Sequence, residues 1–191
     1  MSESAREAIL EAARKAAQAH GYGGLNFRDI GAEVGIKAAS IYHHFPSKAD
    51  LGAAVAKRYW ENTAASLEAL LAASGDPIQA LQAYPGLFRR SLEEDNRMCL
   101  CSFMAAEYDD LPDTVKVEVQ AFADVNVAWL ARMLAATSVP DSERETRARA
   151  IFAAVAGAQL MARSRADLSL FDALIVSFRE SGLIPVPLAT R

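Results

Sequence analysis

One stretch of the chain, residues 26–51, constrains the fold more than any other. It reads NFRDIGAEVGIKAASIYHHFPSKADL. Phe27, Ile30 and Val34 recur at the spacing of one helix face, and Asn26 has the side chain of an N-cap residue. These features predict a short amphipathic helix that begins directly after Asn26.

A turn and a second short helix follow in the same stretch. Gly35 has no Cβ, so it can take the positive φ that a tight turn requires. Ile41 and Phe45 then lie four residues apart, which places both on the inner face of a helix over residues 38–45. Pro46 ends that helix, because the residue before a proline is disfavoured in the α conformation. Two short helices joined by a glycine turn, with polar and aromatic side chains outside, are typical of a DNA-binding helix-turn-helix.

The stretch also resembles a known family. It is similar to the TetR family of bacterial one-component repressors in the segments Gly21-Tyr22, Asp29-Ile30-Gly31, Val34-Gly35-Ile36, Ser40-Ile41-Tyr42-His43-His44-Phe45 and Ser47-Lys48. The resemblance covers the first quarter of the chain. It implies a helix-turn-helix DNA-binding domain at residues 1–47 and an effector-binding and dimerisation domain at residues 48–191.

The remaining sequence predicts helices throughout. Alanine is abundant, and the chain holds only ten glycines and seven prolines among 191 residues. We expect an all-α fold of about nine helices, a three-helix head and a larger bundle. The expected helices are 3–20, about 26–34, 38–45, 48–74, one from 76 that Pro85 kinks or divides, 97–110, 111–136, 140–165 and 167–181. The segment 184–187 contains two prolines and is not expected to continue the last helix.

The charge distribution and the cysteine content narrow the class of protein further. Residues 1–48 hold six Lys/Arg against five Asp/Glu, so this part carries +1 and the rest −5 of the total of −4. The longest uncharged stretch near the C-terminus, 150–162, is shorter than the roughly 20 residues that span a bilayer. The N-terminus shows no apolar signal region, and two cysteines do not make a disulfide scaffold. We therefore expect a cytoplasmic protein without membrane partners.

The resemblance assigns the residues that face DNA. Those at positions that commonly contact DNA in the family are Lys37, Ala38, Ala39, Ser40, Tyr42, His43 and Lys48, and Arg28 is a further phosphate-binding candidate. Hydroxyls and ammonium groups suit phosphate oxygens, and lysine at position 37 suits either a guanine edge or a phosphate. The family usually has Ser or Thr at that position, where it caps the helix. Lysine cannot accept the backbone N–H bonds, so we expect a weaker cap here. Tyr42 would also suit a small helical core.

The body is expected to bind an effector and a second copy of the chain. Pocket candidates are the aromatic, methionine and glutamine residues Tyr84, Phe88, Phe103, Met104, Tyr108, Trp129, Met133 and Gln159. The dimer that the resemblance implies would use the last two helices, through Phe152, Val155, Gln159, Phe171, Leu174, Ile175 and Phe178. The same residues could equally form an intramolecular core.

Cys99 and Cys101 raise the alternative of thiol-based sensing of oxidants or electrophiles. Two residues apart on a helix, they would point to nearly opposite faces, one buried and one exposed, which disfavours a disulfide between them. Buried structural cysteines are the default interpretation. Metal binding is not expected, because the adjacent His43 and His44 would have only His20 as a further histidine partner.

These features predict a homodimeric repressor that is released from a pseudo-palindromic operator by a small-molecule effector. No cofactor and no catalytic residue is expected. One alternative is a helical enzyme or ligand carrier with a vestigial head, although no catalytic triad, phosphate loop or metal-spaced cluster is present. Carboxylates such as Glu107, Asp109 and Asp110 have no evident partner and suggest a solvated helix end. The other alternative, an architectural DNA binder, leaves the large acidic body unexplained.

Overall fold

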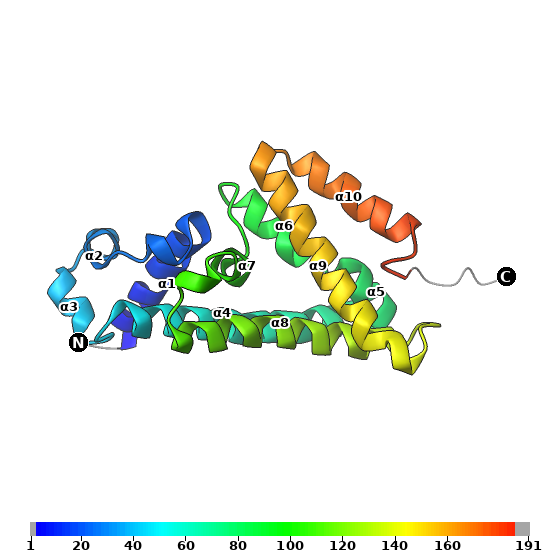
Figure 1. The fold of residues 1–191 in the computed structure, drawn as a ribbon, viewed down its shortest axis with the longest axis horizontal. Helices are drawn as coiled ribbons and strands as arrows, with labels where there is room; N and C mark the ends of the chain where they lie inside the picture. Colours follow the sequence, from blue (N-terminus) through cyan, green and yellow to red (C-terminus); the bar gives the residue numbers. More distant parts are fainter. Residues whose placement is uncertain (1–2, 186–191) are drawn as a thin grey trace. The chain divides into compact units, whose positions relative to one another are not determined.

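The computed structural model describes residues 3–185, and the secondary-structure elements of this part of the chain are all helices (Figure 1). Ten α-helices and two 3-10 helices follow one another: α1 (Glu3–His20), η1 (Tyr22–Gly24), α2 (Phe27–Val34), α3 (Ala38–Tyr42), α4 (Lys48–Ser74), α5 (Pro77–Ala83), α6 (Gly86–Glu93), α7 (Leu100–Ala105), η2 (Tyr108–Asp110), α8 (Asp113–Leu134), α9 (Asp141–Arg165) and α10 (Leu168–Glu180). This confirms the all-α expectation of about nine helices. The count is ten because Pro85 separates α5 from α6.

Two helix starts agree with the expected ones at positions that a capping aspartate marks. The Asp76 side chain accepts a hydrogen bond from the Gln79 N–H at 3.0 Å, and α5 begins at the proline that follows it. Asp167 caps α10 in the same way, through the N–H groups of Ser169 and Leu170. Each capping side chain accepts a hydrogen bond from a backbone N–H of the first helical turn, which has no partner within the helix.

The predicted helix at 97–110 is shorter and divided. Only residues 100–105 form α7, and η2 follows separately. Asp95 and Asn96 both have positive φ, 59° and 54°, and Cys99 has an extended backbone, so the chain turns before the helix can start. The predicted break at 184–187 lies partly outside the described residues.

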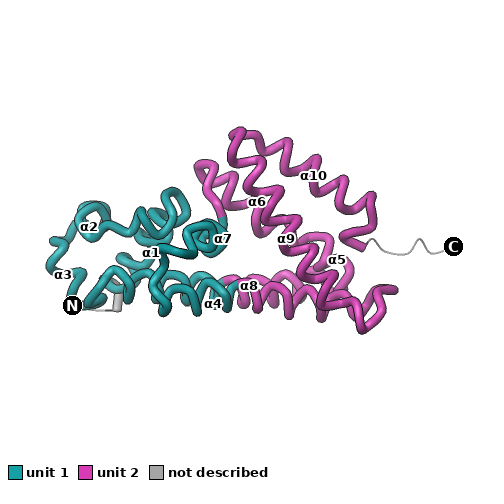
Figure 2. Tube along the Cα trace, viewed as in Figure 1, with its two compact units in different colours: residues 1–62, 99–122 teal, residues 63–98, 123–191 magenta. Residues whose placement is uncertain are grey.

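Contacts divide the chain into two compact units (Figure 2). Unit 1 comprises residues 1–62 and 99–122, and unit 2 comprises residues 63–98 and the described residues from 123 onward. Helices α4 and α8 are each divided between the units: the N-terminal part of each belongs to unit 1 and the C-terminal part to unit 2. The boundary at residue 47 between DNA-binding and effector domains stays a prediction.

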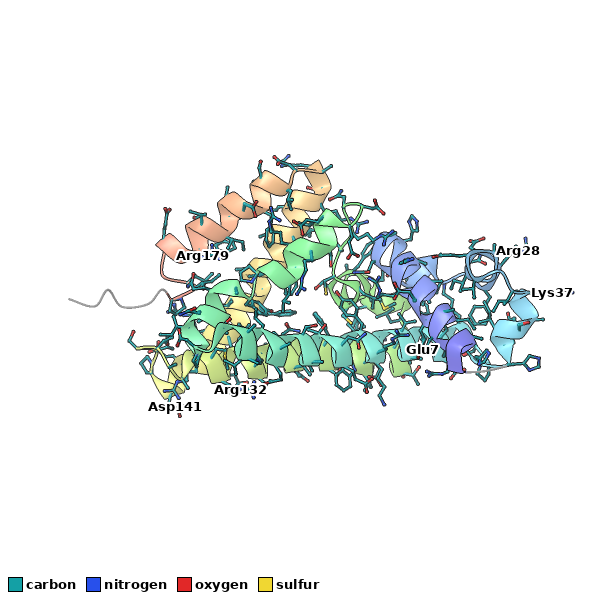
Figure 3. All side chains as sticks on the ribbon, turned by 180° about the vertical axis from the view of Figure 1, so that it is seen from behind. Glu7, Arg28, Lys37, Arg132, Asp141 and Arg179 are labelled. Carbon is teal, nitrogen blue, oxygen red and sulfur yellow. The ribbon has the colours of Figure 1, made fainter. Side chains whose placement is uncertain are left out.

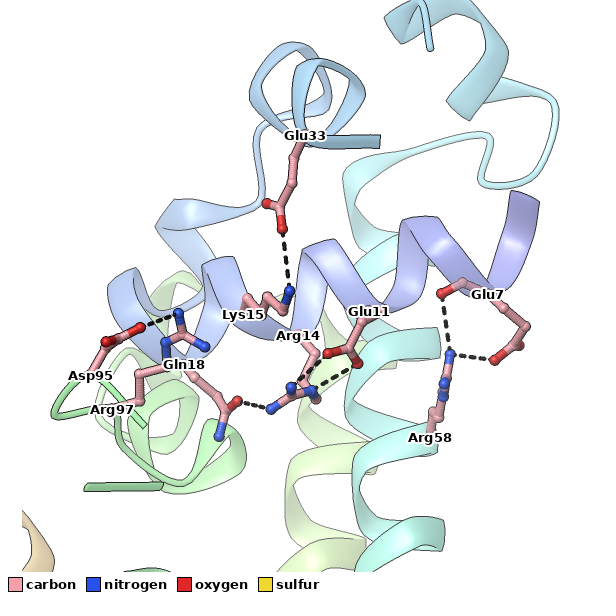
Figure 4. Close-up of polar contacts among 9 residues, drawn as sticks. All are labelled: Glu7, Glu11, Arg14, Lys15, Gln18, Glu33, Arg58, Asp95 and Arg97. Atoms are coloured by element: carbon pink, nitrogen blue, oxygen red, sulfur yellow. Dashed lines mark hydrogen bonds and ion pairs between the residues drawn. The ribbon is translucent and has the colours of Figure 1, made fainter. Parts of the chain in front are cut away.

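Unit 1 is built on α1, which packs against α2, η1 and α7. Its apolar face buries Ile9 and Ala13 completely, beside Leu25, Ile30 and Ile41 from the segments that follow. Ion pairs brace its polar side (Figure 4): Arg58 of α4 reaches Glu7, and Lys15 reaches Glu33 of α2 at 3.7 Å. The helix-turn-helix therefore rests on α1 through an apolar core with charges at its rim.

Unit 2 is a bundle in which α9 packs against α10 and α6. The Gln159 side chain donates to the Phe88 carbonyl at 2.7 Å, which joins α9 to α6. Arg89 of α6 makes two hydrogen bonds to the Asp172 carboxylate of α10, at 2.7 and 3.0 Å. No helix among the described residues has both the length and the hydropathy needed to cross a bilayer.

Candidate nucleic-acid interface and effector region

The turn between α2 and α3 is shaped by side-chain capping and by two glycines. The Asn26 side chain accepts hydrogen bonds from the N–H groups of Arg28 and Asp29, as the sequence predicted. Gly35 ends α2 in the left-handed conformation with φ 76°. At Gly31, a Cβ would lie 2.8 Å from the Ile36 carbonyl oxygen, so only glycine allows α2 to approach the turn this closely.

Helix α3 is held by its inner side chains. Ile41 is fully buried and Phe45 nearly so, as expected from their spacing. The helix ends at Tyr42 rather than Phe45, although the N–H groups of His44 and Phe45 still bond to the Ile41 carbonyl and prolong the turn. Lys37 is the N-cap residue, has an extended backbone and makes no side-chain cap bond, which confirms the prediction for this position.

The predicted DNA-contacting residues differ in exposure. Lys37, Ala39, Tyr42, His43 and Arg28 are exposed, whereas Ala38, Ser40 and Lys48 are half-buried. Arg28 and Lys37 project from the end of unit 1 that α2 and α3 form (Figure 3). The structure thus places four members of the set, on α3 or at its two cap positions, in open solvent.

The Tyr42 side chain is both packed against the helix-turn-helix core and open to solvent. Its side chain is 55% exposed, yet its ring packs on Phe27 with the ring centroids 4.7 Å apart. The packing fixes the ring, and the exposure leaves the hydroxyl available to a partner outside the chain. Neither role excludes the other.

Lys48 begins α4, directly after the N-cap. The Ser47 hydroxyl accepts the Asp50 N–H at 3.1 Å and donates to the Asp50 carboxylate at 2.6 Å. The Lys48 ammonium lies over the Tyr22 ring, 4.5 Å from its centroid, and 3.5 Å from the Gly23 carbonyl oxygen. It is therefore positioned by η1 as well as by its own helix.

Glu107 is the residue that sequence reasoning missed in this unit. Its carboxylate accepts the N–H of Tyr22 at 2.6 Å and that of Gly23 at 3.4 Å. The prediction of a solvated helix end without a partner is therefore wrong for this residue. The partners lie 85 and 84 positions away in the sequence, and no local pattern indicates them.

In unit 2, five of the eight pocket candidates are buried: Tyr84, Phe88, Trp129, Met133 and Gln159. Tyr84 stacks on Trp129 with centroids 5.9 Å apart and lies 5.6 Å from the Phe88 ring. Its hydroxyl donates a hydrogen bond to the side-chain amide oxygen of Asn126 at 2.9 Å. The sequence analysis did not single out Asn126, a fully buried amide.

The other three candidates belong to unit 1, so the structure does not gather all eight into one cluster. Met104 is buried and Phe103 half-buried. Tyr108 is an exposed residue of η2, and the Lys116 ammonium lies 4.6 Å from its ring centroid. Its exposure places Tyr108 on the surface of unit 1 rather than in a cavity.

A cavity of about 350 Å³ adjoins the aromatic cluster in unit 2. Its walls are mainly apolar, and they comprise Ala64, Leu67, Glu68, Val125, Ala128, Trp129 and Arg132. Arg132 of α8 pairs with Glu68 of α4 beside it. The Trp129 indole N–H is buried and has no hydrogen-bond partner in the described part of the chain.

Both cysteines are buried, so the expectation of one exposed thiol is wrong. Cys99 is the N-cap residue of α7 rather than part of its regular turns, and the two-residue spacing therefore does not separate the side chains onto opposite faces. Burial raises the pKa of the Cys99 thiol, against hydrogen bonds from Ser102 and Tyr59. Burial and the neighbouring Cys99 raise the pKa of Cys101 well above its usual range.

The seven predicted dimer residues divide by burial. Val155, Gln159, Phe171 and Ile175 are buried within a single chain, and Phe152, Leu174 and Phe178 are half-buried. The first four belong to the intramolecular core that the sequence left open as an alternative. Large apolar side chains that remain exposed on α9 and α10 are Leu160, Met161 and Val176, each about half exposed.

Comparisons with known proteins agree with this geometry. A family model described as bacterial regulatory proteins of the tetR family matches residues 9–55. A TetR-family transcriptional regulator from Agrobacterium tumefaciens is 31% identical, with a TM-score of 0.86 over 94% of this chain and 97% of that chain. A TetR transcriptional regulator from Legionella pneumophila is 27% identical, with a TM-score of 0.87 over 95% and 98%.

A third structure, the reduced form of NemR from E. coli, is 21% identical, with a TM-score of 0.79 over 92% of this chain and 96% of that chain, and shows a shared fold. No curated protein matches the chain. The helix-turn-helix, the all-α architecture and the full-length similarity to a relative above 30% identity lead to one assignment. This chain belongs to the TetR family of bacterial transcriptional regulators.

Proposed function

We propose that this regulator is a cytoplasmic homodimeric repressor that binds a pseudo-palindromic operator and leaves it when a small apolar effector binds. The observation that carries the proposal is the exposure of α3 and its N-cap. Lys37, Tyr42 and His43 face solvent while Ile41 and Phe45 anchor the helix from below. A short helix held in this way can enter a major groove with its N-terminal end toward the base edges.

The candidate DNA-contacting residues separate into two kinds. Tyr42, Lys48, Ser40 and Arg28 carry hydroxyl or cationic groups that suit phosphate oxygens, which set register but carry no sequence information. Lys37 precedes α3, where it is free to reach guanine O6 and N7 or a phosphate. Ala38 and Ala39 permit close approach and apolar contact with thymine methyl groups.

A dimer would supply two reading helices for two half-sites. In helix-turn-helix dimers these sites lie about 34 Å apart, one turn of DNA. The exposed Leu160, Met161 and Val176 support pairing through α9 and α10, because apolar side chains of this size gain free energy when a second copy covers them. Such pairing would keep Val155 and Phe171 in the core of each chain, with the half-buried Phe152, Leu174 and Phe178 at its edge.

The effector would bind in unit 2, in the cavity bordered by Trp129 and Leu67. Its mainly apolar walls support a small apolar molecule as the effector. Both α4 and α8 line the cavity, and α4 begins at Lys48. Ligand binding that shifts α4 would therefore alter the DNA-contacting end of the same helix.

Thiol sensing is the alternative function. Reactive cysteines depend on a low pKa and on access to solvent. Cys99 and Cys101 have raised pKa values and are both buried, so their environment favours a structural role. An enzymatic function has no support from a cluster of catalytic groups in the described residues.

The test is binding of the purified protein to its own upstream DNA across a salt series, with Tyr42→Phe as the variant. Phenylalanine keeps the ring packing on Phe27 and removes only the hydroxyl. We expect operator affinity to fall by about tenfold, as for loss of one hydrogen bond to a charged group, with an unchanged melting temperature. Tyr42→Ala removes the ring as well and should abolish binding.

Lys57→Gln, at an exposed position of α4, is the control and should bind like the wild type. If the wild-type protein binds neither its upstream DNA nor any sequence from a random pool, the proposed function is wrong. If Tyr42→Ala binds as tightly as the wild type, the assignment of α3 as the reading helix is wrong.

A further inference from the structure

The side chain of Glu107 joins the segment between α7 and η2 to η1. The backbone of this residue is fixed on both sides, since its N–H bonds to the Met104 carbonyl and its carbonyl accepts the Asp110 N–H, each at 2.9 Å. Its carboxylate spans to η1 and accepts the N–H groups of Tyr22 and Gly23. A carboxylate accepts stronger hydrogen bonds from backbone N–H groups than a neutral acceptor does.

The first residue of this turn is shaped to receive that carboxylate. Gly21 has φ +66°, and a Cβ at this position would lie 2.2 Å from one Glu107 carboxylate oxygen and 2.7 Å from the other. Any other residue would displace the carboxylate as well as strain the backbone. Gly21 and Glu107 therefore form a matched pair, although they are far apart in the sequence.

The opposite side of the same turn holds Lys48. Its ammonium lies over the Tyr22 ring and near the Gly23 carbonyl oxygen, so the residues whose N–H groups bind Glu107 also position Lys48. The Tyr22 ring is fixed in turn, because a Cβ on Gly52 would lie 2.8 Å from it and 3.2 Å from Val115. A continuous series of contacts leads from Glu107 through η1 to the first residue of α4.

We propose that Glu107 is a positioning residue for DNA binding, which acts by fixing η1 and, through Tyr22 and Gly23, the ammonium group of Lys48. With the carboxylate in place, the Lys48 ammonium is held at the N-terminus of α4, where it binds a DNA phosphate. This inference rests on the proposed DNA-binding function and names a residue that regulates it.

The test is a double-mutant cycle that compares the wild type, Glu107→Ala, Lys48→Met and the double variant. Operator affinity is measured for each protein at several salt concentrations. Each phosphate neutralised contributes about 0.9 to the slope of log affinity against log salt. We expect Glu107→Ala to lower affinity about tenfold and to reduce the slope by about one unit per protomer. In the Lys48→Met background the same substitution should change neither quantity, because residues in one network are not additive.

Two further variants separate positioning from structural support. Glu107→Gln keeps a carbonyl oxygen for the Tyr22 N–H and should restore most of the affinity and slope. Asp109→Ala removes an exposed carboxylate from the same segment and should leave both unchanged. If Glu107→Ala does not fold, Tyr22→Leu removes the ring beneath Lys48 and should show the same loss of slope.

A lower melting temperature with an unchanged salt slope, or additive effects in the cycle, would overturn the proposal and leave Glu107 as a structural contact. Both of these outcomes require that the wild type binds operator DNA. Failure of the wild type to bind any DNA would instead reject the proposed function. The two failures are therefore distinguishable in one series of measurements.

Discussion

At the scale of single residues, the least expected group is the buried polar set around α7. Tyr59 packs 5.6 Å from the Phe122 ring, and burial raises its pKa well above the ordinary phenol range, with the two nearby thiols adding to the shift. Cys99 and Cys101 have raised pKa values for the same primary reason, burial. All three groups are therefore neutral in the folded protein over the physiological pH range.

This burial predicts the pH dependence of stability. A thiol whose pKa is raised on folding stabilises the protein fully below the unfolded value, about 8.5, and this contribution is lost as the pH rises toward the folded value. We expect the free energy of unfolding in urea to be level from pH 7 to 8. Above that range it should fall by at most about 1.4 kcal/mol per pH unit for each thiol.

The matched variant is Cys101→Ala, which should lower stability overall through the volume it removes but should show a shallower alkaline decline. An identical decline in the variant would mean that Cys101 does not contribute to it. Direct access of a thiol reagent to either cysteine in the folded protein would contradict the burial itself.

At the scale of helices, α3 shows how a weak cap can serve binding. The backbone of Lys37 has the extended conformation of an N-cap residue, φ −71° and ψ 144°, but its side chain supplies no acceptor. The N–H groups of the first turn therefore lack the bond that Asn26 provides for α2. The lysine contributes positive charge, in place of a cap, at the end of the helix that we propose faces DNA.

Lys37→Thr should consequently stabilise the protein and weaken DNA binding. A threonine hydroxyl at an N-cap position stabilises a helix by about 1 kcal/mol relative to a residue that cannot cap. Loss of the ammonium should lower operator affinity and reduce the salt slope by about one unit per protomer. Urea unfolding measures the expected gain in stability, and operator binding across a salt series measures the expected loss of affinity and slope.

The matched control is Lys57→Gln, which removes a lysine from an exposed position on α4. It should alter neither stability nor the salt slope by a comparable amount. A Lys37→Thr protein that binds with the wild-type salt slope would show that Lys37 does not contact a phosphate.

At the scale of the whole molecule, assembly depends on the apolar surface that each chain leaves uncovered. The buried Val155, Phe171 and Ile175 are already used by the single chain, so they cannot also be the contact with a partner. Leu160 and Met161, adjacent on α9, and Val176 on α10 remain exposed. Exposed apolar groups of this size gain free energy when a second chain covers them.

If the proposed dimer forms through this surface, Leu160→Glu should convert it to a monomer, because a carboxylate would be buried without a partner in the interface. Light scattering after size-exclusion chromatography measures the mass directly. Val117→Glu is the control, since Val117 is also an exposed apolar residue but lies on α8. Its mass should stay that of a dimer. If Leu160→Glu remains dimeric, the interface lies elsewhere on the chain.

Several elements could be predicted from sequence because the interactions that define them are local. Asn26 bonds to donors two and three residues away, Gly35 turns the chain within one residue, and Asp76 bonds three residues ahead. Helical spacing likewise identified Ile41 and Phe45 as inward-facing. These patterns, with the resemblance they support, were sufficient for the fold class and for the candidate DNA-binding helix.

Other features depended on partners distant in the sequence. The pairing of Glu107 with Tyr22 joins positions 85 residues apart, and a lone carboxylate near a helix end carries no sign of it. Burial of Gln159 depends on the Phe88 carbonyl, 71 residues away. Helix α7 starts only at Leu100 because the chain first turns at Asp95 and Asn96, which have positive φ values. The local sequence does not indicate this turn.

By itself, the sequence determined the helices, most of their ends and the helix-turn-helix, because capping, glycine turns and helical periodicity act over four residues or fewer. The tertiary structure decided which apolar faces became core and which stayed exposed, that both thiols are buried, and that Glu107 holds η1. Such outcomes depend on which surfaces meet when the helices pack. Many pairings satisfy the same apolar pattern, and only the packed chain selects one of them.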